Sequence, residues 1–180
     1  RSSEADIQFD FENESTWGSL PEADACIVTF ALSKIEHSKK FVKHLNGISR
    51  RVVVIGTTGS IEVEYDNQIV NEVSPLSRDT ERVNSEEQFR EMGANIVRAA
   101  GIYGAKRDPR NWVMKGLVGP EERYVNFIHV DDLCQFLLAA CKLPESGKNF
   151  IASDNSPQKW SELIEQWKRE YNLVSPPDYK

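Results

Sequence analysis

The 180-residue chain has few cysteines and no long apolar run. No stretch approaches the roughly 20 apolar residues that a membrane-spanning helix needs, so we expect no membrane span. The three cysteines, Cys26, Cys134 and Cys141, form no C-x-x-C pair and lie within apolar runs. This pattern indicates reduced, buried thiols in a reducing compartment, either the cytoplasm or an organelle stroma. We expect no metal site.

A surplus of positive charge is also absent. The 22 lysines and arginines are outnumbered by 28 acidic residues, which gives a net charge of −6. Nucleic-acid binding needs clustered cations against the phosphates, so a nucleic-acid partner is not expected. A hydrophobic content of 39% is typical of a soluble globular protein, and 180 residues suffice for one domain with a real core.

A further absence concerns the arrangement of the ten glycines, because no G-x-G-x-x-G motif occurs in the chain. In doubly wound α/β proteins this motif sets backbone N–H groups and a helix N-terminus against the pyrophosphate of a dinucleotide. The chain by itself is therefore expected to bind such a cofactor weakly or not at all.

Short apolar runs that alternate with amphipathic segments predict the fold. Continuous apolar runs are typical of strands buried on both faces of a parallel sheet. The predicted strands are a short edge strand at 7–11, buried strands at 24–30, 51–56 and 94–98, extended chain at 124–130, and a last strand at 149–152. Strand, helix and strand at this spacing predict an α/β, Rossmann-like parallel sheet with flanking helices.

Capping signals mark the predicted helices. Ser33 with Glu36 forms a capping box for a helix that closes at Asn46-Gly47. A polar helix follows over about 79–92, and the next is capped by Asp131 or Asp132. Ser156 caps the final helix, which has Pro157 at its first position and an aromatic stripe that we interpret as core. We predict a single, partial Rossmann-like domain over 1–180, with 104–130 and 149–180 as a smaller substrate-side region.

The residues that follow the predicted strands are the candidates for a site, because ligands in such folds lie beyond the carboxyl ends of the strands. The rule selects 29–32, 56–60 and 99–103. The hydroxyls of Thr57 and Thr58 can hydrogen-bond a substrate carbonyl or alcohol, or they can simply satisfy the backbone of an ordinary turn.

Histidine and arginine residues near the same edge leave similar alternatives open. His129, next to two carboxylates, can act as an acid or base or can be bonded to backbone and partly buried. Arg98, Arg107 and Arg110 can grip a phosphate or carboxylate at the mouth of the cleft, or they can be plain surface residues.

Five phrases in a fixed order resemble one family. They are Asp24–Ala31, Arg51–Gly59, Asn71–Pro75, Ile96–Gly104 and Phe127–Leu133. Together they resemble the fourth to sixth strands, the N-E-x-x-P-like stretch, the R-P-x-x-V-Y-G turn and the F-I-H-V-D-D element of the extended, or atypical, short-chain dehydrogenase/reductase superfamily. The resemblance covers roughly residues 24–154 and lies in the branch of NAD(P)-dependent epimerase/dehydratase-like proteins.

The resemblance implies roles for particular residues. It places the catalytic serine or threonine at Thr57 or Thr58, with Arg107 and His129 on the substrate side. The residues that it places beside NAD or NADP are Ala31, Leu32, Ala99, Gly101, Ile102 and Tyr103. It also implies that the family's first strand, Gly-rich turn and first helix precede Arg1, so that the chain is the C-terminal portion of a parent protein that binds NAD or NADP.

One departure from the family lies inside the chain. The catalytic Tyr-x-x-x-Lys is replaced at the same spacing by Arg78-Asp-Thr-Glu-Arg82. Arginine stays charged and cannot donate a proton at neutral pH, although Arg82 can still contact a ribose or phosphate. The sequence therefore predicts a catalytically degenerate epimerase-, dehydratase- or reductase-like protein acting on an unidentified small molecule. The alternative is a non-catalytic scaffold or assembly subunit, whose open sheet edge a partner or a missing segment covers.

Overall fold

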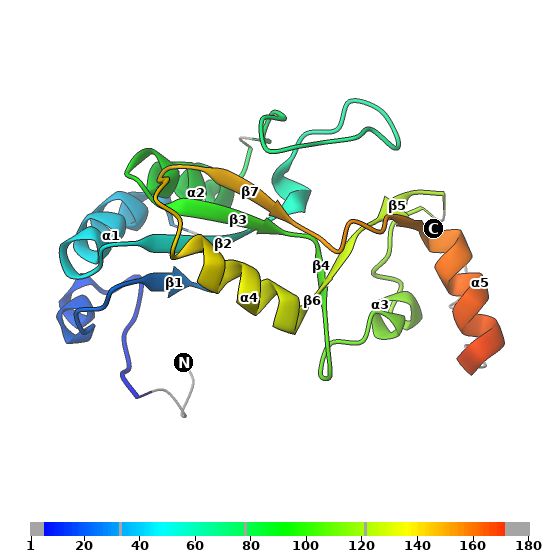
Figure 1. Cartoon of the computed structure of the whole chain (residues 1–180), viewed down its shortest axis with the longest axis horizontal. Coiled ribbons are helices and arrows are strands. Elements are labelled where there is room, and N and C mark those ends of the chain that lie inside the picture. Colours follow the sequence, from blue (N-terminus) through cyan, green and yellow to red (C-terminus); the bar gives the residue numbers. More distant parts are fainter. Residues whose placement is uncertain (1–5, 33, 78, 121, 172–180) are drawn as a thin grey trace.

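A four-stranded parallel sheet forms the centre of the computed structural model, which describes residues 6–32, 34–77, 79–120 and 122–171 (Figure 1). The strand order is β1-β2-β3-β7, and every neighbouring pair is parallel. These strands are β1 (Cys26–Val28), β2 (Val52–Thr57), β3 (Asn95–Ala99) and β7 (Asn149–Ala152). The predicted Rossmann-like α/β fold is confirmed.

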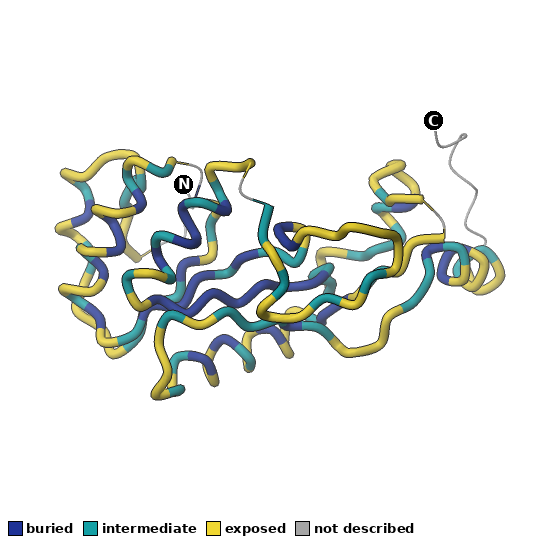
Figure 2. The backbone as a smooth tube through the Cα atoms, turned by 90° about the horizontal axis from the view of Figure 1, so that it is seen from above, coloured by how far each residue is buried: buried dark blue, intermediate teal, exposed yellow. Residues whose placement is uncertain are grey.

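Both faces of the sheet are covered, which explains why its strands are mostly apolar. Val54 and Ile96 point into one core, where they meet Phe41 of α1 (Ile35–Ile48) and Phe89 of α2 (Glu81–Glu91). Val53 points to the opposite core, beneath α4 (Val130–Ala140). Figure 2 shows the result as a buried strip along the middle strands, between helices that are exposed on their outer sides.

The chain leaves the main sheet after β3 and builds a smaller region. In this region β4 (Gly101–Tyr103) pairs in parallel with β6 (Phe127–His129), and β5 (Tyr124–Val125) pairs antiparallel with β8 (Gln158–Lys159). Two helices, α3 (Arg110–Met114) and α5 (Trp160–Tyr171), complete it around a third core. The buried residues of this core are Val113, Phe127, Trp160, Leu163 and Ile164.

The predicted edge strand at 7–11 is wrong. Local side-chain bonds hold this segment in turns, because the carboxylate of Asp10 accepts from the Glu12 amide and Asn13 caps the 3-10 helix η1 (Glu14–Ser19). Phe9 and Phe11 still point inward, where they pack on Phe41 at ring-centroid distances of 5.8 and 5.4 Å. The apolar alternation therefore marks burial without strand pairing.

Two helix starts differ from the prediction. The N-cap of α4 is His129 rather than Asp131 or Asp132. The final helix begins at Trp160 rather than near Pro157, because residues 158–159 are taken into β8. Ser33, the predicted cap of the first helix, lies outside the described residues.

The remaining predicted elements are found close to their expected bounds. The predicted helices over 33–47 and 79–92 correspond to α1 and α2, and Gly93 follows α2 with a φ of +97°. One predicted core thiol is misplaced, because Cys134 lies on the exposed side of α4, whereas Cys26 and Cys141 are half-buried.

Candidate functional site

A compact turn ends β2 and carries the predicted hydroxyls. The short 3-10 helix η2 (Thr58–Ser60) follows Thr57 directly, and the Gly59 amide donates to Thr57 Oγ1 at 3.2 Å. Ser60 Oγ donates to the Thr57 carbonyl and closes the turn. Because Thr57 accepts the amide proton, its own hydroxyl hydrogen is left to donate to a ligand oxygen.

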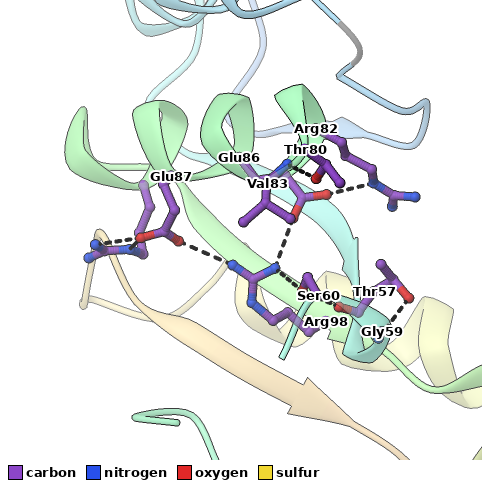
Figure 3. Close-up of polar contacts among 10 residues, drawn as sticks. Thr57, Gly59, Ser60, Thr80, Arg82, Val83, Glu86, Glu87 and Arg98 are labelled. Carbon is purple, nitrogen blue, oxygen red and sulfur yellow. Dashed lines mark hydrogen bonds and ion pairs between the residues drawn. The ribbon is translucent and has the colours of Figure 1, made fainter. Parts of the chain in front are cut away.

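A buried arginine fixes this turn from behind. Arg98 Nη1 donates to Ser60 Oγ at 2.7 Å and to Glu86 Oε2 at 2.8 Å, and Nη2 donates to Glu87 Oε1 at 3.1 Å (Figure 3). Arg98 is 1% exposed and both carboxylates are almost as deeply buried. The prediction that Arg98 lies at the cleft mouth is wrong. The guanidinium does grip carboxylates, but they are the protein's own, because a charge on a central strand must be paired to be buried.

Arg82 lies at the surface end of the same network. Its Nε donates to Glu86 Oε1 at 2.8 Å, and its side chain is 37% exposed (Figure 3). A continuous line of polar contacts thus runs from Arg82 through Glu86 and Arg98 to Ser60. It joins the position where the resemblance puts the family's lysine to the hydroxyl turn. Position 78, where the resemblance puts the tyrosine, lies outside the described residues.

Sequence reasoning selected the segment that holds Ser60 but missed Glu86 and Glu87 as parts of this site. Two adjacent carboxylates on a helix gave no signal of burial by themselves. The usable signal was Arg98, an arginine inside the otherwise apolar run that became β3, because such a residue requires buried acidic partners.

The residues predicted to contact a cofactor fall into two groups. Leu32 and Ala99 are 1% and 3% exposed, and their side chains pack in the two cores on either side of the sheet. Ala31 is exposed, and Gly101, Ile102 and Tyr103 of β4 are half-buried at the carboxyl end of β3. Ala31 and the β4 residues therefore have surface to offer a ligand, whereas Leu32 and Ala99 pack the scaffold.

Tyr103 and His129 lie side by side on β4 and β6. Their positions are paired in register, and the rings meet edge to face with centroids 5.0 Å apart. His129 Nδ1 accepts the Asp131 amide at 3.3 Å as the N-cap of α4. Because Nδ1 is used in this way, a neutral His129 carries its proton on Nε2 and can donate from that atom alone.

Arg107 and Arg110 occupy the loop before α3. Arg107 is exposed, with its guanidinium 5.6 Å from the centroid of the Trp112 ring. Arg110 grips Asp108 through Nε at 2.8 Å and lies 4.1 Å from the centroid of the Tyr171 ring. The hydrogen bond from Arg110 lowers the pKa of Asp108 below its ordinary value. Because Arg110 is already bonded to Asp108, Arg107 is the more available of the two arginines for binding an anionic ligand.

Two kinds of feature are absent from the described residues. No helix in that part of the chain is long and apolar enough to cross a membrane. Nor do the described side chains bring three or more histidines, cysteines and carboxylates together as a metal site would require.

Comparison with known proteins supports the fold. The chain superposes with a TM-score of 0.74 on DesIV, a dTDP-glucose 4,6-dehydratase from Streptomyces venezuelae with NAD bound, at 16% identity over 94% of the chain. RMD from Pseudomonas aeruginosa, complexed with NADPH, gives a TM-score of 0.73 at 14% identity over 95% of the chain. A variant of the UDP-glucuronic acid 4-epimerase from Bacillus cereus, complexed with a UDP-sugar and NAD, gives 0.75 at 13% identity over 96%.

These likenesses define a class. The chain has the Rossmann-like fold that these dehydratase and epimerase structures share, as predicted from the ordered phrases. The chain spans 65% of the length of DesIV, 74% of RMD and 67% of the epimerase. No protein-family model matches the chain, and neither does any curated protein.

Proposed function

We propose that this chain forms the substrate-side portion of a nucleotide-cofactor protein related to epimerases, dehydratases and reductases, and that it has lost the family's tyrosine–lysine proton transfer. The observation that carries the proposal is Arg82. It stands where the resemblance puts the lysine, ion-paired with buried Glu86 and tied through Arg98 to the hydroxyl turn. The scaffold of the site is thus kept, while the proton-transferring groups are not.

The residues at this edge fit one half of the cofactor. Thr57 can donate a hydroxyl proton, Tyr103 and His129 add a phenol and an Nε2–H, and Arg82 can contact a ribose hydroxyl or phosphate as a fixed cation. A bound nicotinamide would supply hydride transfer. These side chains would bind and orient a substrate, but Arg82 cannot exchange a proton with it because a guanidinium stays charged.

The proposal is tested by mapping where NADH binds. We expect millimolar NADH to shift the backbone amide resonances of residues 57–60 and 101–103 in a ¹⁵N-labelled sample. Arg82→Met should weaken these shifts by removing the cation. Arg169→Met, which removes an exposed arginine from α5, is the matched control and should leave them unchanged. Shifts confined to other segments would contradict the proposed site.

A second candidate function is a non-catalytic scaffold. In the described part of the chain, β1 has a paired neighbour on one side only, β2, so its other edge is open to another strand. Natural proteins cover such edges, because an unpaired row of N–H and C=O groups invites pairing. The same NADH titration separates the two functions. A folded protein whose amides do not respond to NADH at all would favour the scaffold.

A further inference from the structure

Loop 61–76, between η2 and α2, presents an unusual apolar surface. Ile69 and Val73 are 94% and 89% exposed, and Tyr65 and Val63 are 65% and 57% exposed. Single exposed apolar side chains are ordinary, whereas four on one loop indicate a contact surface. In Figure 1 this loop runs above β7 and toward β5.

Hydrogen bonds within the loop, and polar contacts from the loop to other segments, hold it in a defined shape. Its ends pair at the bridge between Ile61 and Leu76, and near its tip the Glu64 amide donates to Gln68 Oε1 at 2.7 Å. It is tied to the rest of the molecule by Asp66, which lies 3.4 Å from Arg123, and by Glu72, whose Oε1 accepts the Ile151 amide at 3.2 Å. The apolar side chains are therefore displayed from an anchored structure.

The same loop is acidic. It holds four carboxylates and no lysine or arginine: Glu62, Glu64, Asp66 and Glu72. Two of these are used in the anchoring contacts, which leaves Glu62 and Glu64 beside exposed Val63. A matching surface must therefore combine cations with apolar side chains.

The chain carries such a surface around α1, which lies at the left end of the molecule in Figure 1, away from the loop. Residues 34–51 contain six lysines and arginines against one carboxylate, Glu36. Within this segment α1 lies against η1, and the two helices form a shallow hollow of about 450 Å³. It is lined by Glu14, Trp17, Lys40, Lys43, His44, Gly47 and Ile48. Lys40 also contacts Glu14 at 2.6 Å, and Lys43 is exposed. We call this site the α1 hollow.

We propose that loop 61–76 of one molecule docks on the α1 hollow of a second copy of the chain. The loop supplies apolar side chains and carboxylates, and the hollow supplies half-buried Ile48 and two lysines, Lys40 and Lys43, above the buried Trp17. Because the two surfaces are different, the contact is heterologous, and in a pair one molecule keeps a free hollow while the other keeps a free loop. This inference does not depend on the proposed function.

Sedimentation velocity tests the contact on the whole chain. We expect the average mass to rise with protein concentration up to about 200 µM at about 50 mM NaCl, the range of a weak contact. The association should weaken at about 500 mM NaCl, because screening shortens the reach of the charges. A single monomeric species at every concentration and salt level would overturn the proposal.

Complementary variants then identify the two surfaces. Ile69→Ser with Val73→Ser removes apolar side chains from the loop surface. Lys40→Glu with Lys43→Glu reverses the charge of two lysines that line the hollow. Each pair should raise the dissociation constant at least about tenfold, because it removes apolar burial or charge pairing from the contact. Mixing the two variants should give a one-to-one complex, since the mixture retains one intact loop and one intact hollow.

Matched controls separate this contact from other associations. Leu138→Ser removes an apolar side chain that is 57% exposed on α4, and Lys142→Glu with Lys148→Glu reverses two exposed charges elsewhere. Neither control should change the association. If the wild type associates but the mixed variants do not form a pair, or if the controls weaken it equally, the assigned surfaces are wrong.

Discussion

At the scale of single residues, the Arg98 network is the most consequential feature. Two buried carboxylates, Glu86 and Glu87, face one buried guanidinium, and each carboxylate meets a second arginine, Arg82 or Arg90, nearer the surface. Removing one member of such a buried group leaves the others uncompensated, so the penalty exceeds the net contribution of the pair. The network therefore gives the hydroxyl turn a rigid support and makes it sensitive to substitution.

Arg98→Met tests this support. The variant keeps most of the side-chain volume but removes the donors to Ser60 and both carboxylates, and we expect it to lower the free energy of unfolding by about 3–5 kcal/mol. Arg82→Met removes a partly exposed partner and should lower it by less than about 1 kcal/mol. Urea unfolding measures both values. Equal, small effects would contradict a supporting role for Arg98.

Gly56 lets the network approach β2. A Cβ at this position would lie 3.0 Å from Glu86 Oε2, 3.1 Å from Ile96 Cγ2 and 3.3 Å from Arg98 Nη1. Gly56→Ala should therefore cost about 1–3 kcal/mol through overpacking. Gly47→Ala is the control, because nothing lies within 4 Å of its Cβ and alanine suits a helix, so it should raise stability by up to about 1 kcal/mol. Thermal unfolding of both variants checks the contrast in sign.

The three thiols should differ in reactivity. Burial, and then the neighbouring Cys141, raises the pKa of Cys26, and burial also raises the pKa of Cys141. Cys134 is exposed. At about pH 7.5 we expect a disulfide reagent to label Cys134 first, since the thiolate is the reacting form. Raising the pH should then speed labelling of the other two as their thiolate fractions grow. Peptide mass spectrometry gives the order, and early labelling of Cys26 would contradict it.

At the scale of elements, His129 connects the site to the fold. Its Nδ1 caps α4 while its ring packs against Tyr103, so a single side chain both begins the helix and lies where the proposed function puts the substrate. The cap explains why Asp131 and Asp132 are left in the first turn, where carboxylates are favoured by the helix dipole.

The cap can be tested by substitution. His129→Ala should lower stability by about 1 kcal/mol, whereas His129→Asn should retain most of it because asparagine is a good N-cap. Hydrogen exchange of the Asp131 amide provides a local readout beside the unfolding midpoint. If alanine and asparagine behave alike, His129 does not cap α4.

Part of this structure follows from the sequence because its causes are local. Apolar β-branched runs predicted β2 and β3, and Gly93 predicted the end of α2. Features that depend on distant partners did not follow. The segment at 7–11 alternates like a strand, yet it forms turns that pack against the distant Phe41. The start of the final helix was set by the pairing of β8 with β5.

The candidate site divides in the same way. The position of Thr57 at a strand end followed from the apolar run before it, and the pairing of Thr57 with Ala99 follows from the parallel register of β2 and β3. The apolar run around Arg98 could have indicated its burial, but no local pattern in the sequence shows that its partners are Glu86 and Glu87 of α2. All the catalytic and ligand-binding roles that the resemblance gives to single residues stay predictions, including those of Thr58, Arg107 and Ile102.

At the scale of the whole molecule, the chain keeps the layered core of a Rossmann-like protein while spanning 65% of the length of DesIV. The proposed function places a substrate and a nicotinamide at the hydroxyl turn, the strand ends and the smaller region. The 180 residues contain no Gly-rich turn to hold a pyrophosphate and no Tyr-x-x-x-Lys. The central claim is therefore that this chain retains the shape of a cofactor site without a strong grip on the cofactor.

The most direct test is a fluorescence titration of the 180-residue chain with NADH and with NADPH. The account predicts that neither titration approaches saturation below about 100 µM, which corresponds to a binding free energy weaker than about −5.5 kcal/mol. A dissociation constant of about 1 µM or below for either nucleotide would contradict it, because these residues would then grip a dinucleotide tightly without the Gly-rich turn.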